Sequence, residues 1–201
     1  MDADFCIVEK PDWISWDEIH DFLWKAHEKN RQRGIIMKYP ALPGEEVRKR
    51  VDGNGVMLVA IKGTELVGTA ALVFKEKELW CGVGKYAYCC FAAVSPELHG
   101  CGVYKRLCVE RENVAIKNGV NRMMFDTNEN NHHEIVIALK NGYHKIRQTD
   151  WGDHVNIVLV KWLCGCPYSK QRLMIEYNCS RMKVIVKRML MRFFLSYSKH
   201  I

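Results

Sequence analysis

A glycine-containing segment in the middle of the chain most constrains how this sequence can fold. The apolar run 86–93 is typical of a buried strand, and residues 103–117 are typical of a helix. Gly100 and Gly102 lie between them, at positions where backbone without a Cβ can come close to a ligand. A glycine loop that opens a helix directs backbone N–H groups and the positive helix end at one point. The segment therefore predicts a strand, a loop that suits an anionic phosphate, and a helix.

Hydrophobic periodicity and turn residues divide the rest of the chain into strands and helices around this segment. The predicted strands are 4–8, 56–61, 66–74, 86–94, 120–126, 143–147 and 155–161. The predicted helices are 13–30, 45–51, 103–117, 131–141 and 181–197. The connection 62–65 is typical of a β-hairpin, whereas strand, helix and strand around the glycines predict a parallel, right-handed crossover. The chain is therefore expected to form a mixed α/β sheet of about seven strands with helices on both faces.

The composition is that of a soluble globular protein, with 48% hydrophobic and 26% charged residues. No run approaches the ~20 apolar residues that span a bilayer, and residues 1–6 lack the features of a signal peptide. Nine cysteines without regular spacing favour free thiols in a reducing compartment over a disulfide framework. We therefore expect a cytoplasmic protein.

The net charge of +7 is concentrated at the C-terminal end of the chain. Residues 162–201 contain eight Lys or Arg residues and one acid, Glu176, whereas residues 1–161 contain 22 basic and 22 acidic residues. A neutral body with a basic tail argues for a local interaction and against nucleic acid as a partner. We therefore divide the chain into a domain, 1–161, and a basic helical extension, 162–201.

The predicted helix 181–197 is amphipathic. Its apolar positions are Met182, Val186, Met189, Leu190 and Phe193. Its basic positions are Arg181, Lys183, Lys187, Arg188 and Arg192. Such a helix can dock on the domain or on a second subunit, as in a homodimer, or it can lie on the inner surface of an anionic membrane. The sequence leaves both interpretations open.

The central segment, Val94-x-Pro96-x-x-His99-Gly100-x-Gly102-Val103, resembles the glycine signature of the GNAT superfamily of acyl-CoA-dependent N-acyltransferases. That signature is commonly written V-x-P-x-x-R-G-x-G-I-G. Asn131, followed by Leu139-Lys-Asn-Gly-Tyr143, is similar to the second signature of the family. The resemblance covers about residues 56–161. It implies a GNAT-like fold and an N-acetyltransferase that moves an acetyl group from acetyl-CoA to a primary amine of a small molecule.

The resemblance also implies which residues bind the acyl donor. Backbone of 91–94 would pair with the pantetheine amides, the N–H groups of 99–105 would hold the pyrophosphate, and Asn131 would contact the opposite side. The implied residues are Ala92, Val94, His99, Gly100, Cys101, Gly102, Val103, Tyr104, Lys105 and Asn131. His99 stands where the family usually has Arg or Gln, and Tyr104 stands where it has a small residue. Tyr104 would crowd the helix start, so affinity for CoA is the property that these departures affect.

The catalytic groups are less clearly marked than the binding groups. Acyl transfer from a thioester to an amine needs a base, and the family frequently places it on the strand before the glycine loop. The strand 85–93 has no carboxylate. Tyr86, Tyr88 and Cys90 share one face at period two, so one of them, or a water held there, is the available base; core residues with satisfied polar tips are the alternative.

The tyrosine that the family uses as an acid corresponds to Ala138. The resemblance therefore implies that this role is absent or has moved to another group. The candidates are His132, His133, Tyr143 and a water. A catalytically weak CoA-binding or regulatory module of the same fold is consequently an alternative to an enzyme.

Two other kinds of site match parts of the sequence incompletely. Gly100-x-Gly102, with Asp126 at the end of the next strand, partly matches a nicotinamide-dinucleotide site, but Lys105 replaces the third glycine. Cys164-Gly-Cys166 and Cys179 are poorly spaced for a tetrahedral metal site and are expected to be buried free thiols. We therefore predict no metal site.

The acceptor is the least constrained part of the prediction. Residues 161–169 weakly resemble the tails of acyltransferases that serve bacterial surface-polysaccharide pathways. This resemblance favours an amino sugar as the acceptor, and it would be consistent with a position near the membrane.

Overall fold

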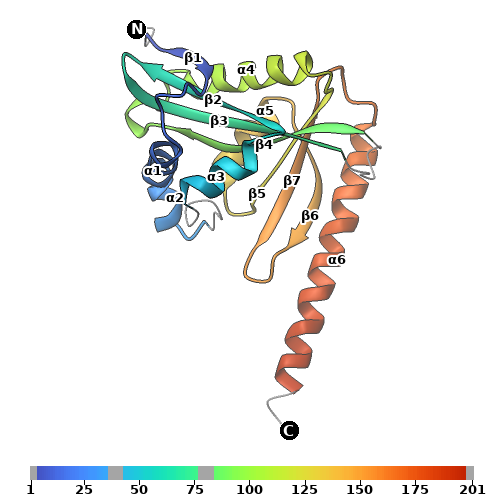
Figure 1. The fold of residues 1–201 in the computed structure, drawn as a ribbon. Helices are drawn as coiled ribbons and strands as arrows, with labels where there is room; N and C mark the ends of the chain where they lie inside the picture. Colours follow the sequence, from blue (N-terminus) through green and yellow to red (C-terminus); the bar gives the residue numbers. More distant parts are fainter. Residues whose placement is uncertain (1–3, 36–42, 77–83, 198–201) are drawn as a thin grey trace. The chain divides into compact units, whose positions relative to one another are not determined.

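The computed structural model describes residues 4–35, 43–76 and 84–197, with side chains described to residue 191 (Figure 1). The strands are β1 (Cys6–Glu9), β2 (Gly55–Lys62), β3 (Glu65–Glu76), β4 (Lys85–Val94), β5 (Arg122–Asn128), β6 (His144–Asp150) and β7 (Val155–Trp162). The helices are α1 (Trp16–Ala26), α2 (Glu28–Gln32), α3 (Gly44–Val51), α4 (Val103–Lys117), α5 (His132–Lys140) and α6 (Lys170–Tyr197), with a 3-10 turn, η2 (Pro96–Leu98). The predicted succession of strands and helices is confirmed.

The seven strands form one mixed sheet in the order β1-β2-β3-β4-β5-β7-β6. Neighbours among β1, β2, β3 and β4 are antiparallel, as are β6 and β7, whereas β4 and β5 are parallel. The parallel pair is connected through α4, as a strand–helix–strand unit requires. The predicted fold class, a mixed α/β sheet with a C-terminal helix, is therefore confirmed.

Contacts within the chain define two compact units. The first contains Met1–Phe125 and Trp162–Cys164, and the second contains Asp126–Lys161 and Gly165–Ile201. The boundary between the two units falls inside β5, and not at residue 162. The predicted division into a domain, 1–161, and a basic extension, 162–201, therefore stays a prediction. We describe each unit by itself.

The sheet of the first unit has helices on both faces, as predicted (Figure 1). On one face, Ile19 and Leu23 of α1 and Val47 of α3 pack into a buried cluster with side chains of β2, β3 and β4. On the other face, α4 approaches the sheet so closely that a Cβ on Gly68 would lie 3.1 Å from side-chain atoms of Val103 and Leu107. This close approach explains a glycine inside β3.

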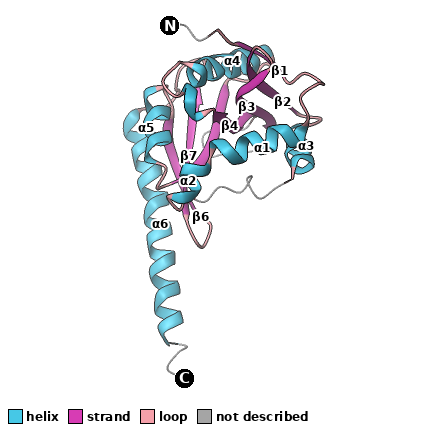
Figure 2. Ribbon diagram, turned by 90° about the vertical axis from the view of Figure 1, so that its left-hand side faces the viewer, coloured by secondary structure: helices cyan, strands magenta, loops and turns pink. Residues whose placement is uncertain are grey.

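The second unit packs α6 against β6 (Figure 2). Leu173 and Val184 of α6 are buried. Tyr177 accepts a 3.0 Å hydrogen bond from the Gln148 side chain, and the Ser180 hydroxyl accepts a 3.0 Å bond from the Gln148 N–H. The tail helix therefore docks on its own chain. Among the described residues, no helix combines the length and low charge needed to cross a bilayer.

The first predicted helix, 13–30, begins too early, and it consists of two helices, α1 and α2, in the structure. Ser15 caps α1 by accepting a 3.1 Å hydrogen bond from the Glu18 N–H, so the helix begins at Trp16. At the other end, His27 interrupts the helix, and a separate short helix, α2, follows. Trp13, which the predicted helix included, precedes α1 and is 60% exposed.

The predicted tail helix, 181–197, was too short. The helix begins at Lys170, and the Ser169 hydroxyl accepts a 3.2 Å hydrogen bond from the Arg172 N–H at its start. The amphipathic pattern of apolar and basic residues begins at position 181, so it predicted only the second half of the helix. The first half of the helix contains buried Leu173, which the sequence pattern did not indicate.

Candidate active site

A β-bulge interrupts β4 close to where the pantetheine was predicted to bind. Ala71 pairs with Cys90 and Thr69 pairs with Ala93, so Phe91 and Ala92 together oppose the single residue Ala70. Phe91 has φ of 52°, which is the one positive φ outside glycine in the described chain. The Thr69 hydroxyl donates a buried 2.8 Å hydrogen bond to the Phe91 carbonyl and holds this conformation.

The bulge lies beyond the parallel pairing of β4 with β5. In the part of the chain that the structure describes, that ladder consists of Ala87 with Met123 and Tyr88 with Met124. After the bulge, β4 continues antiparallel to β3 and leads into residues 95–102, which we call the glycine loop. The bulge thus redirects backbone polar groups between the β4–β5 pairs and the glycine loop.

The glycine loop is fixed at its start. The Ser95 N–H donates a 2.9 Å hydrogen bond to the Val67 carbonyl of β3. The His99 Nε2 lies 3.3 Å from the Val94 carbonyl, so the side chain at the position of the usual Arg or Gln bonds backwards to the strand. The Ser95 hydroxyl donates to the Glu97 carboxylate, and this bond lowers the pKa of Glu97.

Gly100 and Gly102 have φ of 85° and 83°, which is left-handed backbone that strains any other residue. A Cβ at either position would meet no atom within 4 Å. The sequence interpretation was that these glycines let a ligand approach. In the structure, glycine is required at these positions by the left-handed backbone conformation. Crowding by other atoms of the chain is not the reason, because a Cβ would meet none of them.

The glycine loop leads directly into the N-terminus of α4. Gly102 caps the helix without a side-chain hydrogen bond, and the first turn contains no acidic residue. The Arg106 N–H bonds the Gly102 carbonyl at 3.0 Å, and by helix geometry the preceding N–H groups have no acceptor within the helix. Lys105 in the same turn is exposed. This end of α4 is therefore suited to an anion.

A hollow of about 440 Å³ adjoins the glycine loop and α4. It is lined by Phe5, Ile7, Cys101, Gly102, Lys105, Arg106, Val109 and Glu110. The Arg106 guanidinium lies 4.3 Å from the ring centre of Phe5 and donates a 3.3 Å hydrogen bond to its carbonyl. The hollow therefore places two cations, those of Lys105 and Arg106, beside the predicted phosphate-binding backbone.

The predicted binding residues differ in how accessible they are. His99, Gly100, Cys101, Gly102 and Lys105 are exposed. Ala92 and Tyr104 are half-buried, whereas Val94 and Val103 are buried. The exposed members all belong to the glycine loop and the first turn of α4, and the structure brings them together as one surface of the first unit.

Two of the three predicted bases hold their protons firmly. Burial raises the pKa of the Cys90 thiol to about 12, and Cys90 packs beside the cluster under α1 and α3. Burial also raises the pKa of Tyr86, although the nearby Arg122 opposes this effect. Both groups are therefore protonated at neutral pH, and neither is suited to accept a proton unaided.

Tyr88 has a different environment from Tyr86 and Cys90. Its side chain is half-buried, and the Lys75 Nζ lies 4.5 Å from the centre of its ring. Tyr88 also belongs to the last β4 pair with β5 before the bulge. Tyr88 therefore combines partial exposure with a cation close to its ring.

His27 touches the bulge and was missed in the sequence. Its Nε2 lies 3.1 Å from the Ala92 carbonyl, and its Nδ1 lies 3.2 Å from the Asn30 side-chain nitrogen. Because a carbonyl accepts and an amide nitrogen donates, the ring carries its proton on Nε2 and is neutral. Burial lowers the pKa of His27 to about 4, which agrees with a neutral ring at pH 7. In the sequence, the one sign that pointed to His27 was its position near the end of the predicted helix 13–30.

Asn131 and Ala138 belong to the second unit. Asn131 precedes α5, is 8% exposed, and donates a 3.1 Å hydrogen bond to the Thr127 hydroxyl. Ala138 is buried, as is Tyr143, whose N–H donates to the Ala138 carbonyl at 3.0 Å. The contact between Asn131 and the cofactor stays a prediction. So does the identity of the acid that replaces the tyrosine usual at position 138, for which the candidates are His132, His133, Tyr143 and a water.

The cysteines proposed as buried thiols are partly exposed. Cys164 and Cys179 are exposed, and Cys166 is half-buried with its thiol 3.4 Å from the Tyr168 carbonyl. Burial was therefore wrong for Cys164 and Cys179. Across the described ranges, no three His, Cys, Asp or Glu side chains are grouped as a metal ion requires.

The bulged strand, the glycine loop and the open helix end together define an acyl-CoA-type binding framework. The model of the acetyltransferase (GNAT) family matches residues 16–143, which is more than half of the 201 residues. The chain therefore belongs to the GNAT family, and it is an acyl-CoA N-acyltransferase. This family assignment favours an acyltransferase over the nicotinamide-dinucleotide alternative.

Three solved structures illustrate this fold. An acetyltransferase from Streptococcus agalactiae 2603 is 15% identical, with a TM-score of 0.62 over 79% of this chain and 98% of its own. An aminoglycoside 6'-acetyltransferase type Ii is 16% identical, with a TM-score of 0.62 over 81% and 99%. The PaiA N-acetyltransferase from Thermoplasma acidophilum, solved with coenzyme A, is 19% identical, with a TM-score of 0.55 over 79% and 99%. No curated protein matches the sequence.

Proposed function

We propose that this protein transfers an acetyl group from acetyl-CoA to a primary amine of a small molecule. The observation that carries the proposal is the succession of the β4 bulge, the glycine loop and the uncapped start of α4 within one unit. Two similar structures, the PaiA N-acetyltransferase and an aminoglycoside 6'-N-acetyltransferase, are complexes with coenzyme A. Both support CoA as the carrier of the acyl group here.

The proposed reaction is direct attack on the thioester. The amine nitrogen forms a bond to the acetyl carbonyl carbon, the carbon–sulfur bond breaks, the ammonium loses a proton, and the departing thiolate takes one up. Backbone N–H groups near the bulge at Phe91 and Ala92 would stabilise the negative charge on the carbonyl oxygen. The first turn of α4 and Lys105 would hold the pyrophosphate.

We propose that Tyr88 takes part in proton transfer by holding a water that accepts the proton. Raised pKa values keep Tyr86 and Cys90 protonated, as described above. The neutral His27 imidazole is not available either, because both of its nitrogens are hydrogen-bonded. Tyr88 is left as the candidate of the three whose environment allows a part in proton transfer.

The acceptor proposed is an amino sugar. One support is the weak sequence resemblance of residues 161–169, and the other is the aminoglycoside acetyltransferase among the similar folds. A cytoplasmic location and a homodimer stay predictions from the sequence.

Ligand-induced thermal stabilisation tests the donor. Acetyl-CoA is expected to raise the melting temperature, and a nicotinamide dinucleotide is expected to leave it unchanged. Turnover is then followed with a panel of amines, including amino sugars, by the loss of thioester absorbance. This readout avoids thiol reagents, which would react with the nine cysteines. Binding of acetyl-CoA without turnover on any amine would favour the weakly catalytic module instead.

A further inference from the structure

Helix α6 has one face committed to its own unit. Leu173 and Val184 are buried against that unit. Farther along, the Arg188 guanidinium donates hydrogen bonds of 2.9 and 3.1 Å to the Asp150 carboxylate, and the Lys187 Nζ lies 3.1 Å from the same group. The docked face is therefore held along much of the helix, and it leaves the opposite face of α6 outward.

The outward face carries large apolar side chains in one row. We call this row the apolar stripe of α6: Ile175, Met182, Ile185, Val186 and Met189. All five are exposed, from 38% for Ile185 to 66% for Met189. Met182, Ile185, Val186 and Met189 lie on neighbouring turns of one side of the helix, and Ile175 lies on the same side two turns before Met182. A contiguous group of exposed large apolar side chains marks an interaction surface.

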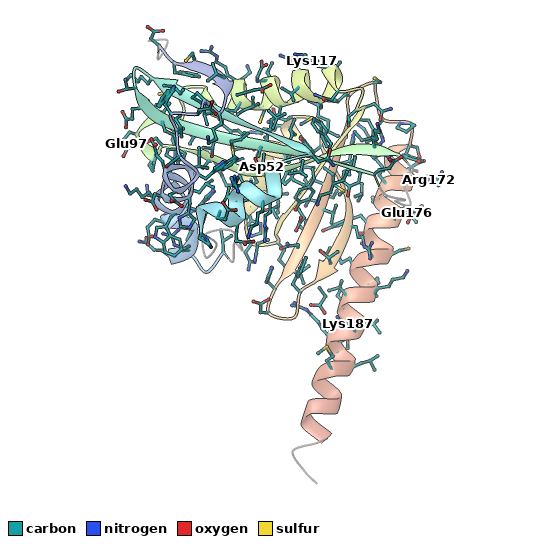
Figure 3. The ribbon with its side chains drawn as sticks, in the orientation of Figure 1. Asp52, Glu97, Lys117, Arg172, Glu176 and Lys187 are labelled. Carbon is teal, nitrogen blue, oxygen red and sulfur yellow. The ribbon has the colours of Figure 1, made fainter. Side chains whose placement is uncertain are left out.

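Basic residues border the apolar stripe of α6 on both sides. By helical geometry, Arg181 follows one edge, and Arg172 and Lys183 follow the other. Glu176 is the one acid in residues 162–201 and lies one turn from Arg172 (Figure 3), whereas Arg181 and Lys183 have no acid within one turn of α6. An apolar row between two rows of cations matches a surface that is apolar beneath and anionic above.

The apolar surface continues from α6 to α5. A hollow of about 460 Å³ in the second unit is lined by Ile185 and Arg181 of α6 and by Val136 and Leu139 of α5. Val136 and Leu139 are themselves exposed. The stripe therefore belongs to a wider apolar area with arginine at its rim.

We propose that the apolar stripe of α6 binds the surface of a lipid bilayer that contains anionic headgroups. The five apolar side chains would enter the boundary between headgroups and acyl chains, and Arg172, Arg181 and Lys183 would contact phosphates. A second copy of α6 on the stripe would bring rows of like charge together, which opposes such pairing. Nucleic acid would satisfy the cations but would leave the Met and Ile side chains in water.

Vesicle flotation with the full chain tests the proposal. The chain is expected to float with vesicles of phosphatidylcholine and phosphatidylglycerol, and to stay in solution with phosphatidylcholine alone. The double variant Met182→Asp/Met189→Asp should bind the anionic vesicles more weakly by roughly tenfold or more, since it puts two charges into the stripe. The matched control is Ile116→Asp on α4, because Ile116 is 59% exposed and lies outside the stripe.

The charge on the stripe border is tested separately. Lys183→Glu should weaken binding on the order of tenfold, and added salt should weaken wild-type binding, whereas Lys117→Glu on α4 should not change it. Equal flotation of the stripe variants and wild type would overturn the proposal. Absence of vesicle binding, together with a wild-type dimer that the double variant dissociates, would overturn it in favour of a second copy.

Discussion

Gly102 and Phe91 are two of the residues whose left-handed backbone the proposed donor site depends on. One begins α4, and the other forms the β4 bulge. Gly102 has no side chain to hold it, whereas Phe91 is held by Thr69. The phosphate site should therefore be sensitive to a single methyl group at Gly102, even though the neighbouring space is open.

Gly102→Ala should lower the free energy of unfolding by about 1 kcal/mol, because the left-handed conformation costs this much for a residue with a Cβ. It should also weaken acetyl-CoA binding, measured by calorimetry, as the backbone relaxes away from the anion. Gly63→Ala in the β2–β3 turn is the control, because Gly63 has φ of 61° and equally open surroundings. Equal affinity in the two variants would remove Gly102 from the site.

His27 should make the folded state sensitive to acid. Its pKa is lowered from 6.5 to about 4 on folding, so below pH 6.5 the unfolded chain takes up a proton that the folded chain resists. Stability is unaffected above this range and falls as the pH drops from 6.5 toward 4. The wild type should lose about 2 kcal/mol between pH 7 and pH 5 from this group. Urea unfolding of His27→Gln should lack this component; an unchanged pH dependence would contradict the account.

Tyr88→Phe should lower kcat by about tenfold to a hundredfold and leave the Kd for acetyl-CoA unchanged, as expected for a group that helps proton transfer. Cys90→Ala is the comparison. It should cost about 1 kcal/mol of stability and change kcat little, because Cys90 is a protonated, packed thiol. Steady-state kinetics and urea unfolding of both variants separate the two roles. A kcat loss in Cys90→Ala alone would reverse the assignment.

At the scale of elements, α6 depends on Asp150. Hydrogen bonds from the Gly152 N–H, Arg188 and Lys187 lower the pKa of Asp150 to about 2. The anchoring interaction is therefore present at neutral pH and is lost as the pH falls below the ordinary carboxylate range. Asp150→Asn should speed tryptic cleavage between Arg181 and Arg188, with Asp153→Asn as a neighbouring control. Identical cleavage rates would show that α6 does not need this anchor.

Element types were largely predictable, while element ends were less so. Alternation and glycine punctuation gave seven strands and the position of α4, because these patterns are local in the chain. The start of α6 was missed, since Leu173 and its neighbours lack the dense apolar and basic pattern of residues 181–197. His27 was missed because its partner, the Ala92 carbonyl, is 65 residues away. The bulge depends on the pairing of Thr69 with Ala93, which a single strand does not reveal.

For the whole molecule, we propose that the glycine loop serves acetyl transfer to an amine. The family assignment and the fold agree with it, and the strand before the loop has no carboxylate to act as the base. The strength of catalysis is therefore the property that separates an enzyme from a binding module. The turnover rate therefore has to be measured on the 201-residue chain with acetyl-CoA as the donor.

The most direct measurement uses acetyl-CoA with an isotopically labelled acetyl group and the best amine from the screen. Mass spectrometry of the products is expected to show the labelled acetyl group on the amine, one free CoA for each product, and slower turnover in Gly102→Ala at limiting acetyl-CoA. Acetyl-CoA that stays intact, with no labelled amine formed by the folded wild-type chain from any acceptor, would contradict the account.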